Sequence, residues 1–501
     1  MERHKKNWIV KTLDEVCQFQ NGFSFKNKDY RNESVDGYVV FRMGNINRGG
    51  GLKRDTSTVR ISKDQSTKLK RYILNKNDIV MCMTDMKSSM DLLGHTAVVD
   101  RDNYYVLNQR VGRITVSRED VLHYRYLFYY TNSETYLLHL RRMAHSGVQV
   151  NLSTKAIKES PIFLPPLPTQ RKIASILGNY DDLIENNTRR IKILEEMAAT
   201  IYREWFVEFR FPEHENVKMV ESELGLIPQG WEVKCFGDVS LNFDRLRKPL
   251  SGQVRSTMQG EYPYYGAASI LDHVNDYLFD GRYLLIGEDG SVITKDGRPV
   301  LQLVAGKFWA NNHTHVVQGK SPISTNFLYL LMSNVTISSY VTGTAQPKIN
   351  QENLNRIPVV SPPRSLLERF DQIVNPIYDD IVILDRKNIN LRNTRDMLLP
   401  KLISGEIDVS GFVINVDGIQ PRMGGTHIPH PLTQWLHSDE KILSGKPVIK
   451  GTRLAVEFII ELLENHWSEE DIRGNYPNIT REDIDACRAY QRKVLDAPVS
   501  G

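Results

Sequence analysis

The sequence has few cysteines, and none stands in a metal-binding or disulfide pattern. Its 501 residues include only Cys17, Cys82, Cys235 and Cys487, which lie far apart and form no C-x-x-C pair. Zinc clusters need closely spaced thiols and disulfide frameworks are typical of small secreted chains, so this spacing favours neither. We therefore expect four buried thiols.

The sequence also lacks long hydrophobic runs. No uncharged apolar stretch approaches the roughly 18 residues that a membrane span requires, and the start has no apolar signal-peptide core. With 41% hydrophobic and 25% charged residues, the composition is that of an ordinary globular protein. We expect a cytoplasmic protein with room for roughly three domains.

Nucleotide-binding and methyl-transfer motifs are missing. The chain has no G-x-x-x-x-G-K-S/T phosphate loop, and no G-x-G-x-x-G motif follows a predicted strand. The pairs Pro165-Pro166 and Pro362-Pro363 lack the asparagine and aromatic neighbours of an adenine methyltransferase loop. The sequence thus predicts a protein that is not itself an enzyme.

A metal site is not predicted either. His313 and His315 can share one face of a strand as two ligands, but no third ligand is indicated nearby. Because a protein zinc site needs at least three side-chain ligands, an ordinary structural role is favoured for both histidines.

What the chain does contain is a repeat. The segment from Asn7 to Val16 matches the segment from Gly230 to Val239, 223 positions later. Further on, the segments 146–152 and 343–349 correspond at an offset of 197. Such a period is far longer than the roughly 20 to 50 residues of solenoid and propeller units. Each copy is therefore expected to be a whole domain followed by a connector.

A seven-residue apolar period predicts a long coiled-coil helix after each proline pair. Asn187 and Asn388 stand in the two seams, where asparagine can fix the register, although it is also common on helix surfaces. Pro376 should kink the second helix or delay its start. The predicted seam residues are Ile173, Leu177, Tyr180, Ile184, Asn187, Ile191, Leu194, Phe370, Ile377, Ile381, Leu384, Asn388 and Leu391.

The order domain, helix, domain, helix predicts an α+β chain whose two long helices pair antiparallel. A helix of about 40 residues spans roughly 60 Å, so the helices would separate the two mixed α/β domains. A small helix-turn-helix-like domain should follow at the C-terminus. The predicted parts are a first domain at 1–164, its long helix at 165–211, a second domain at 212–361, its long helix at 362–408, a linker at 409–433 and a helical domain at 434–497.

Basic residues are concentrated in the first domain. Residues 1–165 hold 27 Lys and Arg against 17 Asp and Glu, a net charge of +10, whereas residues 212–361 hold 13 against 15, a net of −2. The excess favours a polyanion as a partner, and in the second domain a nucleic-acid surface has to be a local patch. The alternative is a solvated face, since phosphate binding requires clustering in space.

Both domains contain side chains suited to DNA. Arginine pairs with guanine edges, and asparagine or glutamine pairs with adenine edges. Tyrosines can serve as well, although each is more often a core residue. The candidate DNA-contacting residues are Arg42, Asn45, Lys53, Arg54, Gln109, Arg110, Arg113, Arg245, Arg247, Lys248, Tyr264, Tyr265 and Lys348.

Several elements together resemble the DNA-specificity subunit of type I restriction-modification systems. In that family, a Pro-Pro-Leu element introduces each long helix, as Leu164-Pro165-Pro166-Leu167 does here. Ser361-Pro362-Pro363-Arg364 departs from it at the last position. Gly343 to Asn350 is similar to the segment that closes a recognition domain, and Tyr264 to Ala267 is similar to the second-domain core. The resemblance covers roughly residues 5–408.

The resemblance implies a subunit without chemistry of its own, in which each domain reads one block of a bipartite double-stranded DNA target. Two modification subunits with S-adenosylmethionine would hold the helices, and restriction subunits with ATP and Mg would join them. No cofactor is expected on this chain. The alternatives are a single-chain restriction enzyme or methyltransferase, disfavoured by the missing motifs, and a coiled-coil adaptor that binds no DNA, disfavoured by the charge of the first domain.

The C-terminal part resembles domain-of-unknown-function family 433, which is related to antitoxins, through Gly445 to Arg453 and Tyr476-Pro477. Ser468 and Thr480, each followed three residues later by an aspartate, predict two capped helix starts. Residues 436–495 hold 9 basic and 11 acidic groups, which favours a protein contact over DNA. The expected core consists of Trp435, Ile449, Ile459, Leu462 and Ile472.

Overall fold

A computed structural model describes the chain in two units. The described residues are 8–31, 36–54, 59–63, 69–86, 90–144, 149–343, 346–411, 432–437, 447–452, 454–464, 467–476 and 479–491. Contacts group Met1–Gly178 with Met397–Gly501, and they make Asn179–Asp396 the second unit. No helix within the described ranges is both long and apolar enough to cross a membrane.

The first unit contains a four-stranded antiparallel sheet in the order β2, β9, β5, β7 and a three-stranded sheet in the order β4, β3, β8. Strand β5 separates two cores, because Ile79 and Met81 face helices α3 and α4 while Val80 and Cys82 face the second sheet. The strands are β1 (Ile9–Thr12), β2 (Cys17–Asn21), β3 (Gly37–Phe41), β4 (Arg60–Ser62), β5 (Ile79–Cys82), β6 (Thr84–Met86), β7 (Thr96–Val98), β8 (Tyr105–Leu107), β9 (Val111–Val116), β10 (Gln149–Asn151) and β11 (Pro161–Leu164), and the helices are α1 (Leu13–Val16), α3 (Tyr124–Thr131), α4 (Glu134–Arg142) and α5 (Thr154–Lys158).

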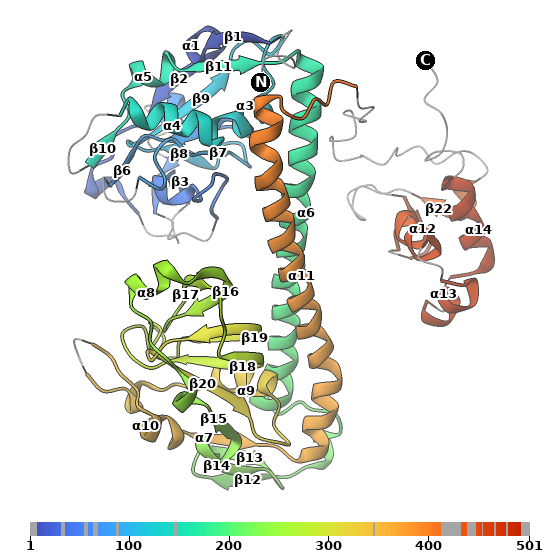
Figure 1. The fold of residues 1–501 in the computed structure, drawn as a ribbon. Helices are drawn as coiled ribbons and strands as arrows, with labels where there is room; N and C mark the ends of the chain where they lie inside the picture. Colours follow the sequence, from blue (N-terminus) through green and yellow to red (C-terminus); the bar gives the residue numbers. More distant parts are fainter. Residues whose placement is uncertain are drawn as a thin grey trace. The chain divides into compact units, whose positions relative to one another are not determined.

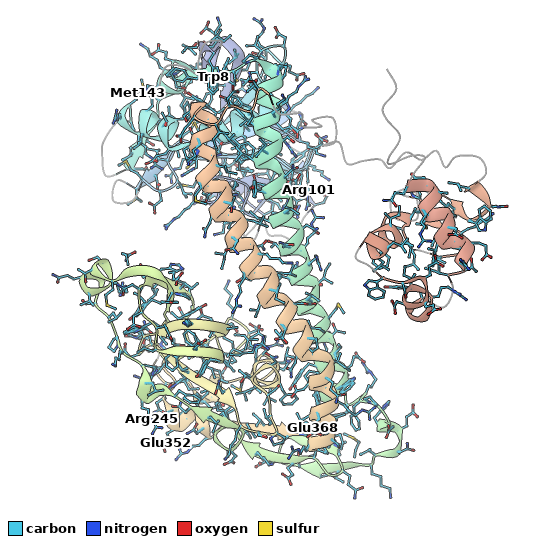
Figure 2. The ribbon with its side chains drawn as sticks, turned by 45° about the vertical axis from the view of Figure 1, so that its right-hand side comes forward. Trp8, Arg101, Met143, Arg245, Glu352 and Glu368 are labelled. Carbon is cyan, nitrogen blue, oxygen red and sulfur yellow. The ribbon has the colours of Figure 1, made fainter. Side chains whose placement is uncertain are left out.

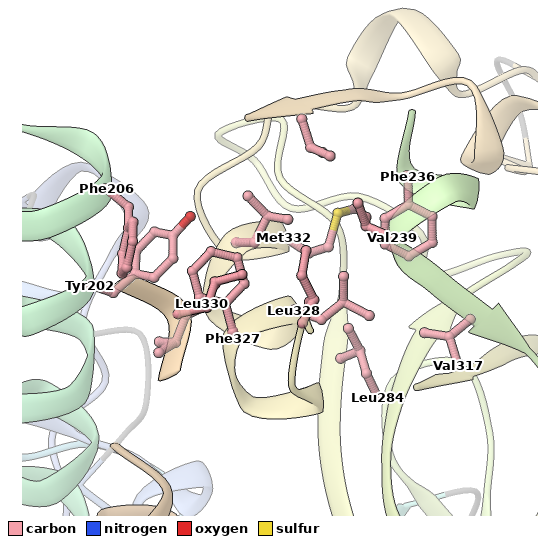
Figure 3. Close-up of a cluster of buried hydrophobic side chains, with 14 of the residues drawn as sticks. Tyr202, Phe206, Phe236, Val239, Leu284, Val317, Phe327, Leu328, Leu330 and Met332 are labelled. Carbon is pink, nitrogen blue, oxygen red and sulfur yellow. The ribbon is translucent and has the colours of Figure 1, made fainter. Parts of the chain in front are cut away.

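The second unit contains a six-stranded sheet in the order β15, β20, β18, β19, β16, β17. Its apolar core joins α9 and the sheet to Tyr202 and Phe206 at the end of the first long helix (Figure 3). The strands are β12 (Met219–Ser222), β13 (Gly225–Pro228), β14 (Glu232–Cys235), β15 (Ser240–Asn242), β16 (Gln259–Tyr265), β17 (Ile270–Val274), β18 (Phe279–Gly287), β19 (Leu301–Ala310), β20 (Thr314–Gly319) and β21 (Pro358–Ser361), and the helices are α7 (Phe236–Val239), α8 (Gly252–Thr257), α9 (Thr325–Met332) and α10 (Gln351–Asn355).

The two units repeat the same strand pairing in the same register. Strand β1 pairs antiparallel with β11 as β14 pairs with β21. Strand β9 lies between β2 and β5 as β20 lies between β15 and β18. Met81 pairs with Gly112 in the first unit, and Ile286 pairs with His315 in the second. The internal repeat of the sequence is therefore a repeat of structure.

The two long helices are α6 (Leu167–Tyr202) and α11 (Arg364–Ser404), and they pair antiparallel within the second unit (Figure 1). The side-chain amide of Asn187 donates to the side-chain oxygen of Asn388 at 3.0 Å. Each of the predicted seam residues is buried or half-buried. Pro376 does not delay α11, which begins twelve residues earlier at Arg364. The proline is exposed, so water can bond the carbonyl that lacks an N–H partner.

The end of α11 packs in the core of the first unit. Leu402, Ile403 and Val409 belong to the apolar core that also contains Leu177 of α6. The Lys172 ammonium donates to the carbonyl of Ser410 at 2.7 Å. The predicted linker start at residue 409 is thus wrong, because Val409 is buried and residue 410 is bonded to α6. Most of the remaining linker, 412–431, lies outside the described residues.

The C-terminal part has a core of its own. It consists of η10 (Leu432–Gln434), β22 (Leu436–His437), β23 (Val448–Ile449), α12 (Val456–Glu464), α13 (Glu469–Asn475) and α14 (Arg481–Tyr490). The side-chain oxygens of Ser468 and Thr480 accept from backbone N–H groups three residues later, which confirms both predicted helix caps. Strand β23 pairs antiparallel with β22.

Three cysteines are buried, as predicted, but Cys235 is exposed. Burial raises the pKa of Cys17 to about 12 and that of Cys82 to about 11. These two thiols are therefore protonated and unreactive at neutral pH.

Candidate nucleic-acid interface

In the first unit, an exposed polar turn joins β8 to β9. Gln109 and Arg110, which we call the first tip, are both exposed. Arg110 has φ of +76°, in the left-handed region that residues other than glycine seldom adopt. The carbonyl of Arg110 accepts from the N–H of Met83 at 2.9 Å. This bond holds the backbone while both side chains remain free to contact a ligand.

Apolar side chains support the first tip. Phe19 on β2 lies over Gly112 on β9, with Met83 beside them, and we call these three residues the apolar support. A Cβ at Gly112 would lie 2.2 Å from the Phe19 ring and 3.0 Å from the sulfur of Met83. Only glycine therefore fits there without rearrangement.

The second unit has an equivalent turn between β19 and β20. Asn312 and His313, which we call the second tip, are exposed. The carbonyl of His313 accepts from the N–H of Glu288 at 2.9 Å, as Arg110 accepts from Met83. The carbonyl of Glu288 accepts from Ile349, just as that of Met83 accepts from Leu152, both at 2.9 Å. The two tips thus occupy corresponding positions.

Charged side chains support the second tip. We call Asp244, Arg247, Glu288 and His315 the ionic cluster. The Arg247 guanidinium donates to Glu288 and to the carbonyl of Thr314, both at 2.6 Å, and to the carbonyl of Asp244 at 3.0 Å. The Asp244 carboxylate accepts from the N–H of Val316 at 2.8 Å. Side-chain exposure ranges from 1% for His315 to 14% for Glu288, so water screens these charges little.

His315 is bonded through both ring nitrogens. Nδ1 lies 2.5 Å from the Asp244 carboxylate, and Nε2 lies 2.9 Å from the carbonyl oxygen of Ile349. Both partners are acceptors, so each ring nitrogen of His315 faces an oxygen to which it can donate. Burial raises the pKa of Asp244, but bonds from His315 and Val316 outweigh it and leave this pKa below its ordinary value. Asp244 is therefore a carboxylate.

Asp244, Glu288 and His315 also bring three possible metal-ligand atoms within 4.8 Å of one another. However, both His315 nitrogens are used in hydrogen bonds and Arg247 is bonded to Glu288. Hydrogen bonds and a guanidinium thus already satisfy these carboxylates, and the arrangement does not favour a metal.

Four predicted DNA contacts in the first unit lie on one loop. Arg42, Lys53 and Arg54 retain exposed or half-exposed side chains, with Arg42 over the Tyr30 ring at 4.8 Å and Arg54 paired to Asp100 at 3.1 Å. The prediction that Asn45 contacts DNA is wrong, because this residue is 7% exposed and its side-chain oxygen accepts from the N–H of Arg42 at 2.8 Å. Asn45 therefore shapes the loop and is too buried to contact DNA.

The prediction that Arg113 contacts DNA is also wrong. Its guanidinium donates to Gln20 at 2.5 Å and to the carbonyl of Ile73 at 3.1 Å, and it lies 3.5 Å from Asp78. It forms one wall of a pocket of about 520 Å³ along the edge strand β2. The role of Arg113 is therefore to join β9 to the segment around Arg71.

In the second unit, Arg245, Lys248 and Lys348 are exposed, as DNA contact requires, and Figure 2 marks Arg245. Tyr264 is wrong as a contact, because it is 1% exposed and its hydroxyl accepts from the N–H of Leu250 at 3.0 Å. The prediction that Arg247 contacts DNA is also wrong, because its guanidinium donates to partners inside the ionic cluster.

Tyr265 is half-buried, with its ring edge-on to that of Phe308 at 5.7 Å between centroids. Like the exposed candidates, it stays a prediction. No sequence pattern pointed to Asn312, Asp244 or Glu288. For His313 and His315 the pattern set a metal site against an ordinary structural role and favoured the structural role. The register of the paired strands is the signal that identifies all of them.

Comparison with known proteins agrees with this architecture. A family model described as the type I restriction modification DNA specificity domain matches residues 5–196 and 228–375. A second model, a protein family of unknown function (DUF433), matches residues 437–491.

Several relatives are similar over most of their length. The MjaIX type I restriction enzyme specificity subunit of Methanocaldococcus jannaschii is 26% identical over 81% of this chain and 94% of its own. The HindI type I specificity subunit of Haemophilus influenzae is 21% identical over 63% of this chain and 84% of its own. The crystal structure of a type I S subunit from M. genitalium covers 79% of this chain and 96% of its own at 17% identity, with a TM-score of 0.49. With more than half of its residues matched by the family model, this chain belongs to the family of type I restriction-modification DNA specificity subunits.

Proposed function

We propose that the protein reads a bipartite DNA site, with residues 1–164 and 212–361 each reading one half-site. The observation that carries this proposal is the repeated register, which presents an exposed polar tip at the same place in both units. A glutamine and an arginine in the first tip, and an asparagine and a histidine in the second, are side chains that can bond base edges.

We further propose that the chain performs no chemistry and binds no cofactor itself. The modification partner would supply S-adenosylmethionine, and a restriction partner would supply ATP and Mg. The sequence supports this division, since it has neither a phosphate loop nor a dinucleotide motif. A cytoplasmic location follows from the same role, because the target is the DNA inside or entering the cell.

The helix pair is the proposed docking surface for modification subunits, of which we expect two. Outside the seam, the second-unit parts of the helices expose large apolar side chains: Leu183, Ile193, Met197, Ile373, Ile383 and Ile389 are each between 44% and 55% exposed. A contiguous patch of exposed apolar groups marks a protein contact site, and these side chains are the candidates for such a patch. Replacing Ile193 by Glu should weaken assembly with the modification partner while leaving the seam intact.

Methylome sequencing of cells that carry this chain with its modification partner tests the main proposal. The expected result is one adenine-methylated motif made of two short blocks with a fixed unread spacer. A continuous motif, or no motif, would contradict bipartite reading. Methyl transfer by the purified chain alone would contradict the absence of catalysis.

The helices are further proposed to set the spacer. One heptad adds about 10.5 Å of helix, close to 3 base pairs of duplex. Inserting seven residues into both α6 and α11 should therefore lengthen the spacer. An unchanged spacer in a complex that still assembles would contradict this role.

The C-terminal part is proposed to act on assembly or expression without selecting bases. Its 9 basic and 11 acidic groups between residues 436 and 495 give it no charge preference for DNA. Its likeness to antitoxins supports contact with a protein.

A further inference from the structure

The ionic cluster ties together three exposed loops of the second unit. Asp244 and Arg247 alternate with the exposed Arg245 and Lys248, and His315 follows the second tip by two residues. His315 also bonds the carbonyl of Ile349, next to the exposed Lys348. Lys348 itself lies 3.7 Å from Glu288. Segments about 100 residues apart in sequence are thus held by one buried set of charges.

The first unit holds its tip differently at the same register positions. Gly112 stands where His315 stands, because each pairs with the corresponding residue of the central strand. Phe19 corresponds to Asn242, since each faces the corresponding residue of the next strand. Van der Waals packing therefore supports the first tip, whereas paired charges support the second tip.

We propose that the ionic cluster is the positioning device for the specificity-determining surface of the second unit, and that this surface comprises Asn312, His313, Arg245, Lys248 and Lys348. This inference rests on the proposed function, because it assigns the residues that read one half-site. The cluster residues do not touch DNA. They fix the three loops so that the exposed side chains meet the bases in one arrangement.

The geometry explains why loss of His315 should act on specificity. Without its ring, the Asp244 carboxylate and the carbonyl of Ile349 both lose a buried donor, and the β20 turn loses its direct side-chain bond to the Lys348 loop. Base reading requires placement within a fraction of an ångström, whereas phosphate attraction tolerates looser loops. Discrimination should therefore fall much more than overall affinity.

His315→Ala in the complex with the modification partner is the main experiment. Binding is measured at fixed salt to the cognate duplex and to duplexes with single base changes in either half-site. We expect discrimination at the second half-site to fall about tenfold or more. Discrimination at the first half-site and affinity for unrelated duplex DNA should not change. Unchanged second-site discrimination, or an equal loss at both half-sites, would overturn the proposal.

Asp272→Asn is the matched control. It breaks the ion pair between Arg255 and Asp272, at 3.0 Å, on β17 at the opposite edge of the same sheet from β15. We expect this variant to keep full discrimination at both half-sites. If it lost second-site discrimination to the same extent as His315→Ala, a general loosening of the unit would be the cause and the positioning role would be wrong.

Tip variants test the proposal even if His315→Ala does not fold. Asn312→Ala and His313→Ala remove exposed side chains, the second together with its 2.5 Å contact to Asp289, so the fold should persist. Each should relax the preference at one or two base pairs of the second half-site. Gln109→Ala should do so in the first half-site. If the wild-type complex discriminates but these variants discriminate equally well, the inference alone fails. If the wild-type complex shows no preference for any duplex, the proposed function fails.

Discussion

The two units share a strand register but support their exposed tips by opposite means. Beneath Gln109 and Arg110 lies the apolar support, in which a glycine leaves room for the ring of Phe19. Beneath Asn312 and His313 lies the ionic cluster, with side chains 1% to 14% exposed. The hydrogen bonds that connect each tip to the central strand are the same in both.

This difference shows which part of the fold is constrained. The backbone pairing around β9 and β20 must be kept, because it places the tip. The side chains beneath the tip can be exchanged if each set is complete in itself: the apolar set must be free of voids and overlap, and the ionic set must have every donor and acceptor paired. A partial exchange satisfies neither condition.

Exchange of a whole unit should have the largest effect. Replacing residues 1–155 by the corresponding part of another specificity subunit keeps each support complete, so the fold should persist. We expect the methylated motif to change completely in one half-site and not at all in the other. Methylome sequencing is the measurement, and a change in both half-sites would show that the units do not read independently.

Gly112→Ala should disturb the first unit alone. The added Cβ would overlap the Phe19 ring, and overpacking of this kind typically costs about 1 to 3 kcal/mol. We expect weaker discrimination at the first half-site and a lower free energy of unfolding. Gly44→Ala is the control, because no atom lies within 4 Å of the added Cβ. Equal effects of the two substitutions would contradict the role given to the apolar support.

The sequence predicts the architecture better than the site. The two copies, the long helices and the capped C-terminal helices follow from local patterns such as the heptad seam and Ser468 with Asp471. The supports depend on which residues pair across strands. The offset between the copies is 223 positions near Trp8 but 203 between Arg110 and His313, because loops differ in length. A fixed offset therefore misses these pairs.

The sequence likewise did not predict which arginine and which tyrosine would be buried. Arg245 and Arg247 are two residues apart, and both suit DNA, yet only Arg247 faces a buried carboxylate. Arg245 and Arg247 lie in and just after a 3-10 turn, where strand alternation does not apply. Tyr264 and Tyr265 are neighbours on β16, so they face opposite sides of the sheet, but the side that is buried depends on tertiary packing.

A change at the paired asparagines of the helix seam should destabilise the second unit without altering either support. Asn187→Leu leaves the side-chain oxygen of Asn388 buried without its donor, which should lower the free energy of unfolding by about 1 to 2 kcal/mol. The double change Asn187→Leu with Asn388→Leu removes both polar groups and should restore most of that loss. Urea denaturation measures both. A double variant that is less stable than the single variant would contradict this account of the pair.

The contribution of the ionic cluster to the free energy of unfolding should decrease at acidic pH. The pKa of Asp244 lies below its ordinary value in the folded chain, so the carboxylate stabilises the fold above about pH 4 and loses this effect as pH falls through the folded pKa. The free energy of unfolding of the wild type should exceed that of Asp244→Asn at pH 5, and the difference should shrink toward pH 3. Asn21 takes the corresponding place in the first unit. The difference caused by Asn21→Ala should therefore be flat over this range.

Removal of the C-terminal part should have the smallest effect on reading. Its described core draws only on residues from Leu432 to Tyr490, so it contributes no buried side chain to the core that contains Leu402 and Val409. A chain that ends at Ser410 keeps Val409 and the carbonyl that Lys172 bonds. We expect this truncated subunit to direct methylation of the same motif, with any change confined to assembly or expression.

A shorter truncation supplies the contrast. A chain that ends at Ile407 loses Val409, which is 2% exposed, and burial of such a side chain is worth about 1.5 to 3 kcal/mol. The shorter chain should therefore be less stable than the chain ending at Ser410, and the loss should arise in the first unit and weaken discrimination at its half-site. Methylation of a different motif after truncation at Ser410 would instead show that the C-terminal part takes part in reading. In that case the C-terminal part would be a third DNA-reading part of the chain, beside residues 1–164 and 212–361.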